Sequence, residues 1–109
     1  MSDFDKDRSL FYNEIGSVPA TIQTSIINEV SPSILFVSQI MCSGDVYAKF
    51  SISRNNKKLA TKRSGPSRNV DFIFRSNLTI KQGDIFKVDV IHFRSDQTPS
   101  FECGVFGYN

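Results

Sequence analysis

The side chains that most often carry chemistry are scarce in this chain, which has one histidine, His92, and two cysteines, Cys42 and Cys103. A catalytic histidine needs a nucleophile and an orienting acid, and no Gly-x-Ser-x-Gly motif or comparable spacing supplies them. These three side chains also offer too few ligands for a closed zinc site. We therefore expect no enzyme, no metal and no other cofactor, and we predict that His92 ends a strand with its ring hydrogen-bonded.

The two cysteines would meet if they lie in strands of facing sheets. Free cysteine is among the most buried residue types and packs as a small apolar group. We expect Cys42 and Cys103 to be a free, buried pair, and a disulfide between them stays open as the alternative.

Acidic residues near the N-terminus have part of the spacing of a calcium-binding loop. Asp3, Asp5 and Asp7 have the spacing of the first three ligands of an EF-hand loop, and Glu14 falls at its twelfth position. Arg8, however, occupies the sixth position, where that loop needs glycine. We interpret these residues as an acidic terminus that can order on a basic partner surface.

A cationic cluster follows in the second half of the chain, and it consists of Lys57, Lys58, Lys62, Arg63 and Arg68. Such a cluster can bind phosphates or an acidic protein face, or it can form a charged edge that blocks sheet-to-sheet aggregation. No aromatic residue lies between Lys57 and Arg68, and the formal net charge is only +2. Both facts argue against a specific nucleic-acid partner.

The elements that must position these residues are strands, because apolar and polar residues alternate over much of the chain. Alternation predicts strands at 46–52, 59–62, 70–74, 86–92 and 101–105, with an earlier one at 22–26. The more continuous apolar run 33–41 predicts a central strand buried on both faces. Turns are expected at Asn55-Asn56 and at 82–84. The only candidate helix is the short segment 9–15.

These strands predict an all-β fold: a single antiparallel β-sandwich of about seven or eight strands. The chain of 109 residues fits one domain, with an N-terminal arm over 1–20 and the sandwich over 21–109. Ten phenylalanines supply the core and tryptophan is absent, so the buried tryptophan of antibody domains is missing. The sandwich is therefore immunoglobulin-like only in a broad sense, and a jelly roll is the alternative layout.

The C-terminal segment 101–108 is apolar almost to its end. If Phe101, Cys103 and Val105 face the core, Phe106 and Tyr108 point outward. Exposed aromatic rings on a strand suggest contact with another chain. Cover by a second layer or by the N-terminal arm is the other interpretation.

Leu78-Thr-Ile80 and Gly83-Asp84 form a corner that leads into the strand 85–90, and a closing strand follows at 101–107. This arrangement resembles a known kind of module. It is similar to small β-sandwich accessory virion proteins of tailed bacteriophages, such as capsid decoration, collar and baseplate-ring proteins. The same corner occurs in adhesin, TNF- and C1q-like jelly rolls. The resemblance covers residues 44–107 and implies a subunit that binds other virion proteins, often as a ring or trimer.

We thus expect a non-enzymatic structural subunit that binds other virion proteins and itself as a homo-oligomer. Its predicted contacts are Phe106 and Tyr108, the cationic cluster, and an arm over 1–18 with Phe4 and Phe11. No signal peptide or apolar run of ~18 residues is present, so we expect synthesis in the host cytoplasm, a place in the virion and no membrane partner. The alternative is a carbohydrate- or cell-surface-binding module, whose platform would combine Tyr47, Tyr108, Asp96 and Gln97.

Overall fold

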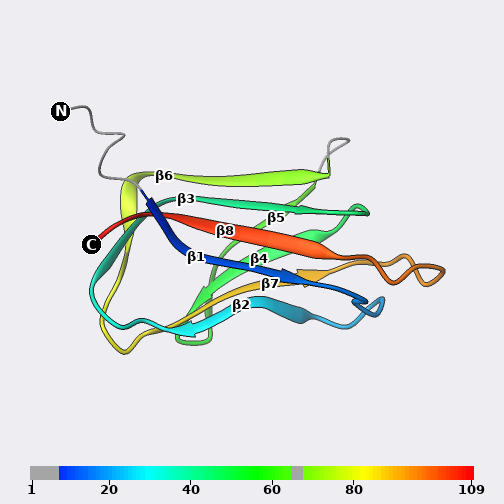
Figure 1. The fold of residues 1–109 in the computed structure, drawn as a ribbon, viewed down its shortest axis with the longest axis horizontal. Coiled ribbons are helices and arrows are strands. Elements are labelled where there is room, and N and C mark those ends of the chain that lie inside the picture. Colours follow the sequence, from blue (N-terminus) through cyan, green and yellow to red (C-terminus); the bar gives the residue numbers. More distant parts are fainter. Residues whose placement is uncertain (1–7, 65–67) are drawn as a thin grey trace.

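The computed structural model describes residues 8–64 and 68–109, which form eight antiparallel strands in two four-stranded sheets (Figure 1). The first, sheet A, has the order β1-β8-β3-β6. Its strands are β1 (Arg8–Ile15), β8 (Phe101–Tyr108), β3 (Leu35–Gly44) and β6 (Asn69–Ile80).

The second sheet, sheet B, has the order β2-β7-β4-β5. Its strands are β2 (Thr24–Val30), β7 (Ile85–Ile91), β4 (Lys49–Arg54) and β5 (Lys57–Arg63). The described residues contain no helix, so none could span a membrane. The expectation of an all-β fold built from two antiparallel sheets is confirmed.

One apolar core lies between the two sheets, and alternation in the sequence identified most of it. In β7, Phe86, Val88 and Val90 are fully buried, and His92 directly after the strand is buried as well. Phe101, Cys103 and Val105 of β8 oppose them from sheet A with at most 1% of their surface exposed. Each strand thus sends every second side chain inward, as period two requires.

The predicted turns are also present. Asn55 and Asn56 connect β4 to β5 with φ angles of 52° and 66°, the left-handed conformation that asparagine tolerates in a tight hairpin. Gly83 has φ 87° in the turn between β6 and β7, where a residue with a Cβ would be strained.

Residues 8–15 were expected to belong to an arm, and 9–15 were the one candidate helix. The structure instead places Arg8–Ile15 in β1, the edge strand of sheet A paired with β8. A register shift between Ser9 and Phe11 puts Leu10 and Phe11 both against the core, which hides the alternation of a strand. In addition, Asn13, two residues from both Phe11 and Ile15, is polar and exposed where alternation would place an apolar residue, and its Nδ2 donates to the Ile26 carbonyl at 2.9 Å.

The prediction that the run 33–41 is buried on both faces was wrong. Its strand, β3, is central in sheet A between β8 and β6, but only one face meets the core. Phe36 is half-buried and Met41 is 46% exposed on the opposite face. The strand is apolar on both sides because sheet A has an apolar outer face.

Candidate functional site

The outer face of sheet A carries apolar side chains across all four strands. The strand register sets Tyr12, Gly104, Met41 and Asp71 in one row, and Phe106, Gln39 and Ile73 in the next. Tyr12, Met41 and Ile73 are 59%, 46% and 69% exposed. We call this surface the apolar face, defined by Tyr12, Phe36, Met41, Ile73, Phe106 and Tyr108.

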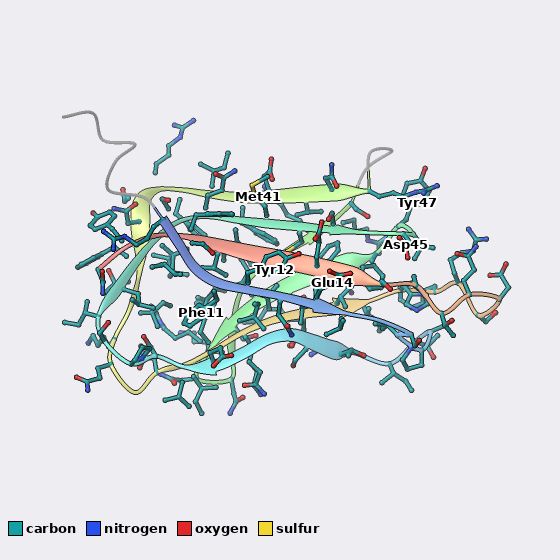
Figure 2. The ribbon with its side chains drawn as sticks, viewed as in Figure 1. Phe11, Tyr12, Glu14, Met41, Asp45 and Tyr47 are labelled. Atoms are coloured by element: carbon teal, nitrogen blue, oxygen red, sulfur yellow. The ribbon has the colours of Figure 1, made fainter. Side chains whose placement is uncertain are left out.

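Gly104 forms the floor of a shallow hollow in the apolar face. A Cβ at this position would lie 2.9 Å from the Phe106 ring and 3.8 Å from Cδ2 of Tyr12, so both rings lie over the glycine. The hollow has a volume of about 380 Å³, and Tyr12, Met41 and Phe106 are its apolar walls. Figure 2 shows Tyr12 and Met41 on this sheet, on either side of β8.

An acidic hollow of about 320 Å³ adjoins the apolar one, with Glu14, Asp45 and Glu102 in its lining. We call these three carboxylates the acidic end of sheet A. Glu102 accepts hydrogen bonds from the hydroxyls of Tyr12 at 2.7 Å and Ser43 at 2.8 Å. These two bonds lower the pKa of Glu102, and the bond to Glu102 raises the pKa of Tyr12.

The two aromatic residues expected to point outward from the last strand do lie on the outer side of sheet A, but both are half-buried. Tyr108 stacks on Phe36 at a centroid distance of 5.2 Å, and its hydroxyl accepts a hydrogen bond from Asn77 Nδ2 at 2.9 Å. Tyr108 is therefore fixed within the protomer. Phe106, over Gly104, is the one that lines the hollow.

The cationic cluster expected from the sequence does not gather at one point. Lys57 and Lys58 are exposed at the start of β5, the edge strand of sheet B. Lys62 donates from Nζ to the Asp71 carbonyl at 2.8 Å and lies 5.5 Å from the centroid of the Phe72 ring. Arg63 ends β5, and the Arg68 guanidinium lies 5.9 Å from the Tyr47 ring centroid.

Of the two aromatic residues that were predicted to contact a partner from the arm, the structure describes one. Phe11 is half-buried and stacks on the core residue Phe86 at 6.3 Å, so its ring packs against the interior of the sandwich instead of reaching a partner. Phe4 lies outside the described residues, as do the acidic residues Asp3, Asp5 and Asp7.

His92 has the hydrogen-bonded ring that the sequence predicted, and its role is structural. Its Nε2 lies 2.8 Å from the Val18 carbonyl oxygen, and its Nδ1 accepts from the Arg94 backbone N–H at 3.2 Å. These partners assign the ring proton to Nε2, which donates to Val18. Because the side chain is fully buried and both nitrogens are engaged, neither nitrogen is open to a substrate.

The cysteines meet within one sheet, not across facing sheets. Cys42 on β3 is directly opposite Cys103 on β8, and their sulfur atoms are 3.5 Å apart as free thiols. The hydrogen bond with Cys42 and burial raise the pKa of Cys103.

The four residues of the alternative carbohydrate platform are not brought together. Tyr108 is opposite Phe36 at the start of β3, whereas Tyr47 follows the other end of that strand, about 26 Å away. Asp96 pairs with Arg94 at 3.3 Å in the loop after β7.

Sequence reasoning missed Tyr12, Met41 and Ile73 as surface-forming residues. Two signals were available: the apolar run in β3, which only Ser38 and Gln39 interrupt between Leu35 and Cys42, and an isoleucine at an outward position of the alternating segment 70–75. Tyr12 gave no signal, since its strand was not predicted.

Comparison with known proteins identified no relative: no protein-family model, no curated protein and no solved structure matches the chain.

Proposed function

We propose that the protein is a non-enzymatic structural subunit that packs against a second copy of itself through the apolar face, as an accessory component of a phage virion. The observation that carries this proposal is the exposure of Tyr12, Met41 and Ile73 on three strands of one sheet. The outer face of an antiparallel sheet is ordinarily polar, and contiguous exposed apolar surface marks a contact with another molecule.

Charge complementarity supports a second copy as the occupant. The acidic end, Glu14, Asp45 and Glu102, borders the apolar face, and Lys57 and Lys58 stand exposed on β5 at the edge of the other sheet. A β5 edge from one copy can therefore meet the acidic end of its neighbour. That contact also covers an edge strand that would otherwise be open to pairing.

A contact between two different surfaces is heterologous, and it closes into a ring when the rotation between copies permits. Such rings agree with the assemblies implied by the resemblance to decoration, collar and baseplate-ring proteins.

For the sandwich class we infer a jelly roll. In the orders β1-β8-β3-β6 and β2-β7-β4-β5, consecutive strands lie in opposite sheets throughout, except for the hairpin of β4 and β5 within sheet B. Eight strands in two such sheets are the layout of jelly rolls, which include viral capsid domains, whereas immunoglobulin sheets hold strands in other orders. This class supports the virion context.

Native mass in solution tests the proposal. Met41→Glu with Ile73→Glu places two charges on the apolar face without touching the core, since both side chains are largely exposed. We expect the unaltered chain to be an oligomer by light scattering after size exclusion, and the double variant to be a monomer with an unchanged melting temperature.

The matched control is Ile22→Glu with Val30→Glu, two side chains of similar exposure, 56% and 62%, away from sheet A. This variant is expected to keep the oligomer. A monomeric unaltered chain at all concentrations, or equal loss of the oligomer in both double variants, would overturn the proposal.

Charge reversal tests the predicted partner surfaces. Lys57→Glu with Lys58→Glu is expected to weaken the oligomer, and Glu14→Lys on the same chain is expected to restore part of it. Absence of any restoration would show that β5 does not meet the acidic end. For the virion context, mass spectrometry of purified particles is expected to find the chain, and to find less of the Met41/Ile73 variant.

A further inference from the structure

Two cations stand side by side at one end of sheet B. Lys49 on β4 and Arg63 on β5 are directly opposite each other in the strand register. Phe50 and Ile52, the inward neighbours on β4, are fully buried, so Lys49 lies on the outer side of the sheet. Like charges directly opposite each other destabilise a sheet.

Nothing in residues 8–64 and 68–109 neutralises these two charges by a hydrogen bond or an ion pair. Asp89 lies on the same outer side of the sheet, opposite Ser51, and its carboxylate accepts hydrogen bonds from Gln23 at 3.0 Å and Ser25 at 2.6 Å. Asp45 accepts from the Ser100 backbone N–H at 2.9 Å, and Asp96 pairs with Arg94. The arrangement therefore favours binding of an anion from outside the chain.

Two exposed aromatic rings border the same position. Tyr47, Lys49, Arg63 and Phe93 line one open hollow of about 260 Å³, with Ala48 in its floor. Tyr47 is 56% and Phe93 64% exposed, and the Arg68 guanidinium lies against Tyr47. We call these four lining residues the stacking site. Tyr47 lies near the end of the sandwich where β3 ends (Figure 2).

We propose that the stacking site binds single-stranded nucleic acid without base specificity, with a base stacked on Phe93 or Tyr47 and a phosphate held by Lys49 and Arg63. Aromatic platforms beside cations are the recurrent means of holding a single strand, because every base has a π-face and every nucleotide a phosphate.

The outer side of sheet B offers a single-stranded nucleic acid a second contact. Lys87 on β7 is opposite Ser53, four residues along β4 from Lys49, which places a further cation about 13 Å away on the same side of the sheet. A nucleic acid longer than one nucleotide can therefore contact both the stacking site and Lys87.

Other ligands fit less well. The hydroxyls of a neutral sugar would find no carboxylate or side-chain amide in the lining, which holds only aromatic, cationic and small residues. An apolar protein surface on Phe93 would have to bury Lys49 and Arg63 without partners, at a large desolvation cost. An acidic glycan satisfies the cations but has no π-face of its own to stack on the rings, and it is the competing outcome of the test.

Fluorescence anisotropy with a labelled oligothymidine of about ten nucleotides at low salt tests the site on the full chain. We expect Phe93→Ala and Lys49→Gln each to weaken binding about tenfold, and binding to weaken with added salt. The matched controls are Ile22→Ala, an equally exposed apolar residue, and Lys81→Gln, an exposed lysine outside the stacking site, and both are expected to bind as the unaltered chain does.

Two further probes decide between ligand classes. Adenosine monophosphate is expected to bind much more weakly than the oligonucleotide. If both bind with equal affinity, the ligand of the site is a free nucleotide and not a single strand, which would overturn the proposal. A sulfated heparin oligosaccharide that binds as tightly, with no loss in Phe93→Ala, would also overturn it, as would no binding of the oligonucleotide. The stacking site includes neither the apolar face nor Lys57 and Lys58, so loss of the oligomer in the Met41/Ile73 variant and loss of oligonucleotide binding in Phe93→Ala are separate results.

Discussion

Tyr12 on the edge strand β1 donates a hydrogen bond of 2.7 Å from its hydroxyl to Oε2 of Glu102 on β8. The bond fixes the tip of the ring at the acidic end, while the ring itself lies over Gly104 and stays 59% exposed. One side chain thus joins the acidic and apolar parts of the surface proposed for self-association. Its position depends on β1 being part of the sheet.

Removal of the Tyr12 hydroxyl should change the titration of Glu102. The hydrogen bonds from Tyr12 and Ser43 lower the pKa of Glu102 below 4.5, so they stabilise the fold at neutral pH and that contribution is lost as pH falls through the lowered pKa. The pKa of Tyr12 is raised above 10.0, so the same bond is lost again as pH rises through the raised value. In Tyr12→Phe we expect the pKa of Glu102, followed by NMR, to rise toward its ordinary value.

Tyr47→Phe is the control for this titration, because Tyr47 is equally exposed and outside the Glu102 site. It should leave the titration of Glu102 unchanged. An identical Glu102 titration in Tyr12→Phe and the unaltered chain would contradict the role given to this bond.

Deletion of residues 1–18 should unfold the sandwich instead of freeing it from an arm. The deletion removes β1 from the edge of β8, removes Phe11 from Phe86 and removes the buried Val18. Loss of the half-buried Phe11 and the buried Val18 alone costs about 3 kcal/mol or more, a large part of the stability of a small domain. Circular dichroism and urea unfolding would measure the effect, and a truncated chain with native stability would contradict it.

His92→Ala should destabilise the fold strongly. The substitution leaves a cavity beside Phe101, whose ring centroid is 5.8 Å from that of His92, and it leaves the Val18 carbonyl without its donor. We expect a loss of about 2–4 kcal/mol in the free energy of unfolding, measured in urea.

His92→Phe separates the two causes, because it restores the ring volume but not the donor. Its expected loss is smaller, about 1–3 kcal/mol, the cost of an unsatisfied buried carbonyl. A change below ~0.5 kcal/mol in the alanine variant would show that His92 is not a core residue.

Cys103 should resist thiol reagents while the protein is folded. The thiolate is the reactive form, and the hydrogen bond with Cys42 and burial raise the pKa of Cys103 so that little thiolate forms at pH 8. A colorimetric thiol assay should detect no rapid reaction of Cys103 in the native protein and both cysteines after denaturation. Rapid native labelling of Cys103 would contradict the burial, and no thiols after denaturation without reductant would show the alternative disulfide.

The alternation of residues determined much of the fold by itself. In β7 and β8 every second residue is apolar, and because strand geometry has period two, this pattern fixes which side chains face the core before any partner strand is known. The asparagine pair at 55–56 similarly specified its hairpin through local backbone preference. These features depend only on neighbours in sequence.

The tertiary structure decided the features that depend on partners far along the chain. β1 became visible as a strand only because β8 supplies its hydrogen bonds, since a bulge and Asn13 obscure its own pattern. Apolar residues in β3 could not reveal whether another layer covers their second face. The apolar face and the stacking site are each built from three or more separated segments, and only the pairing of strands brings their side chains together.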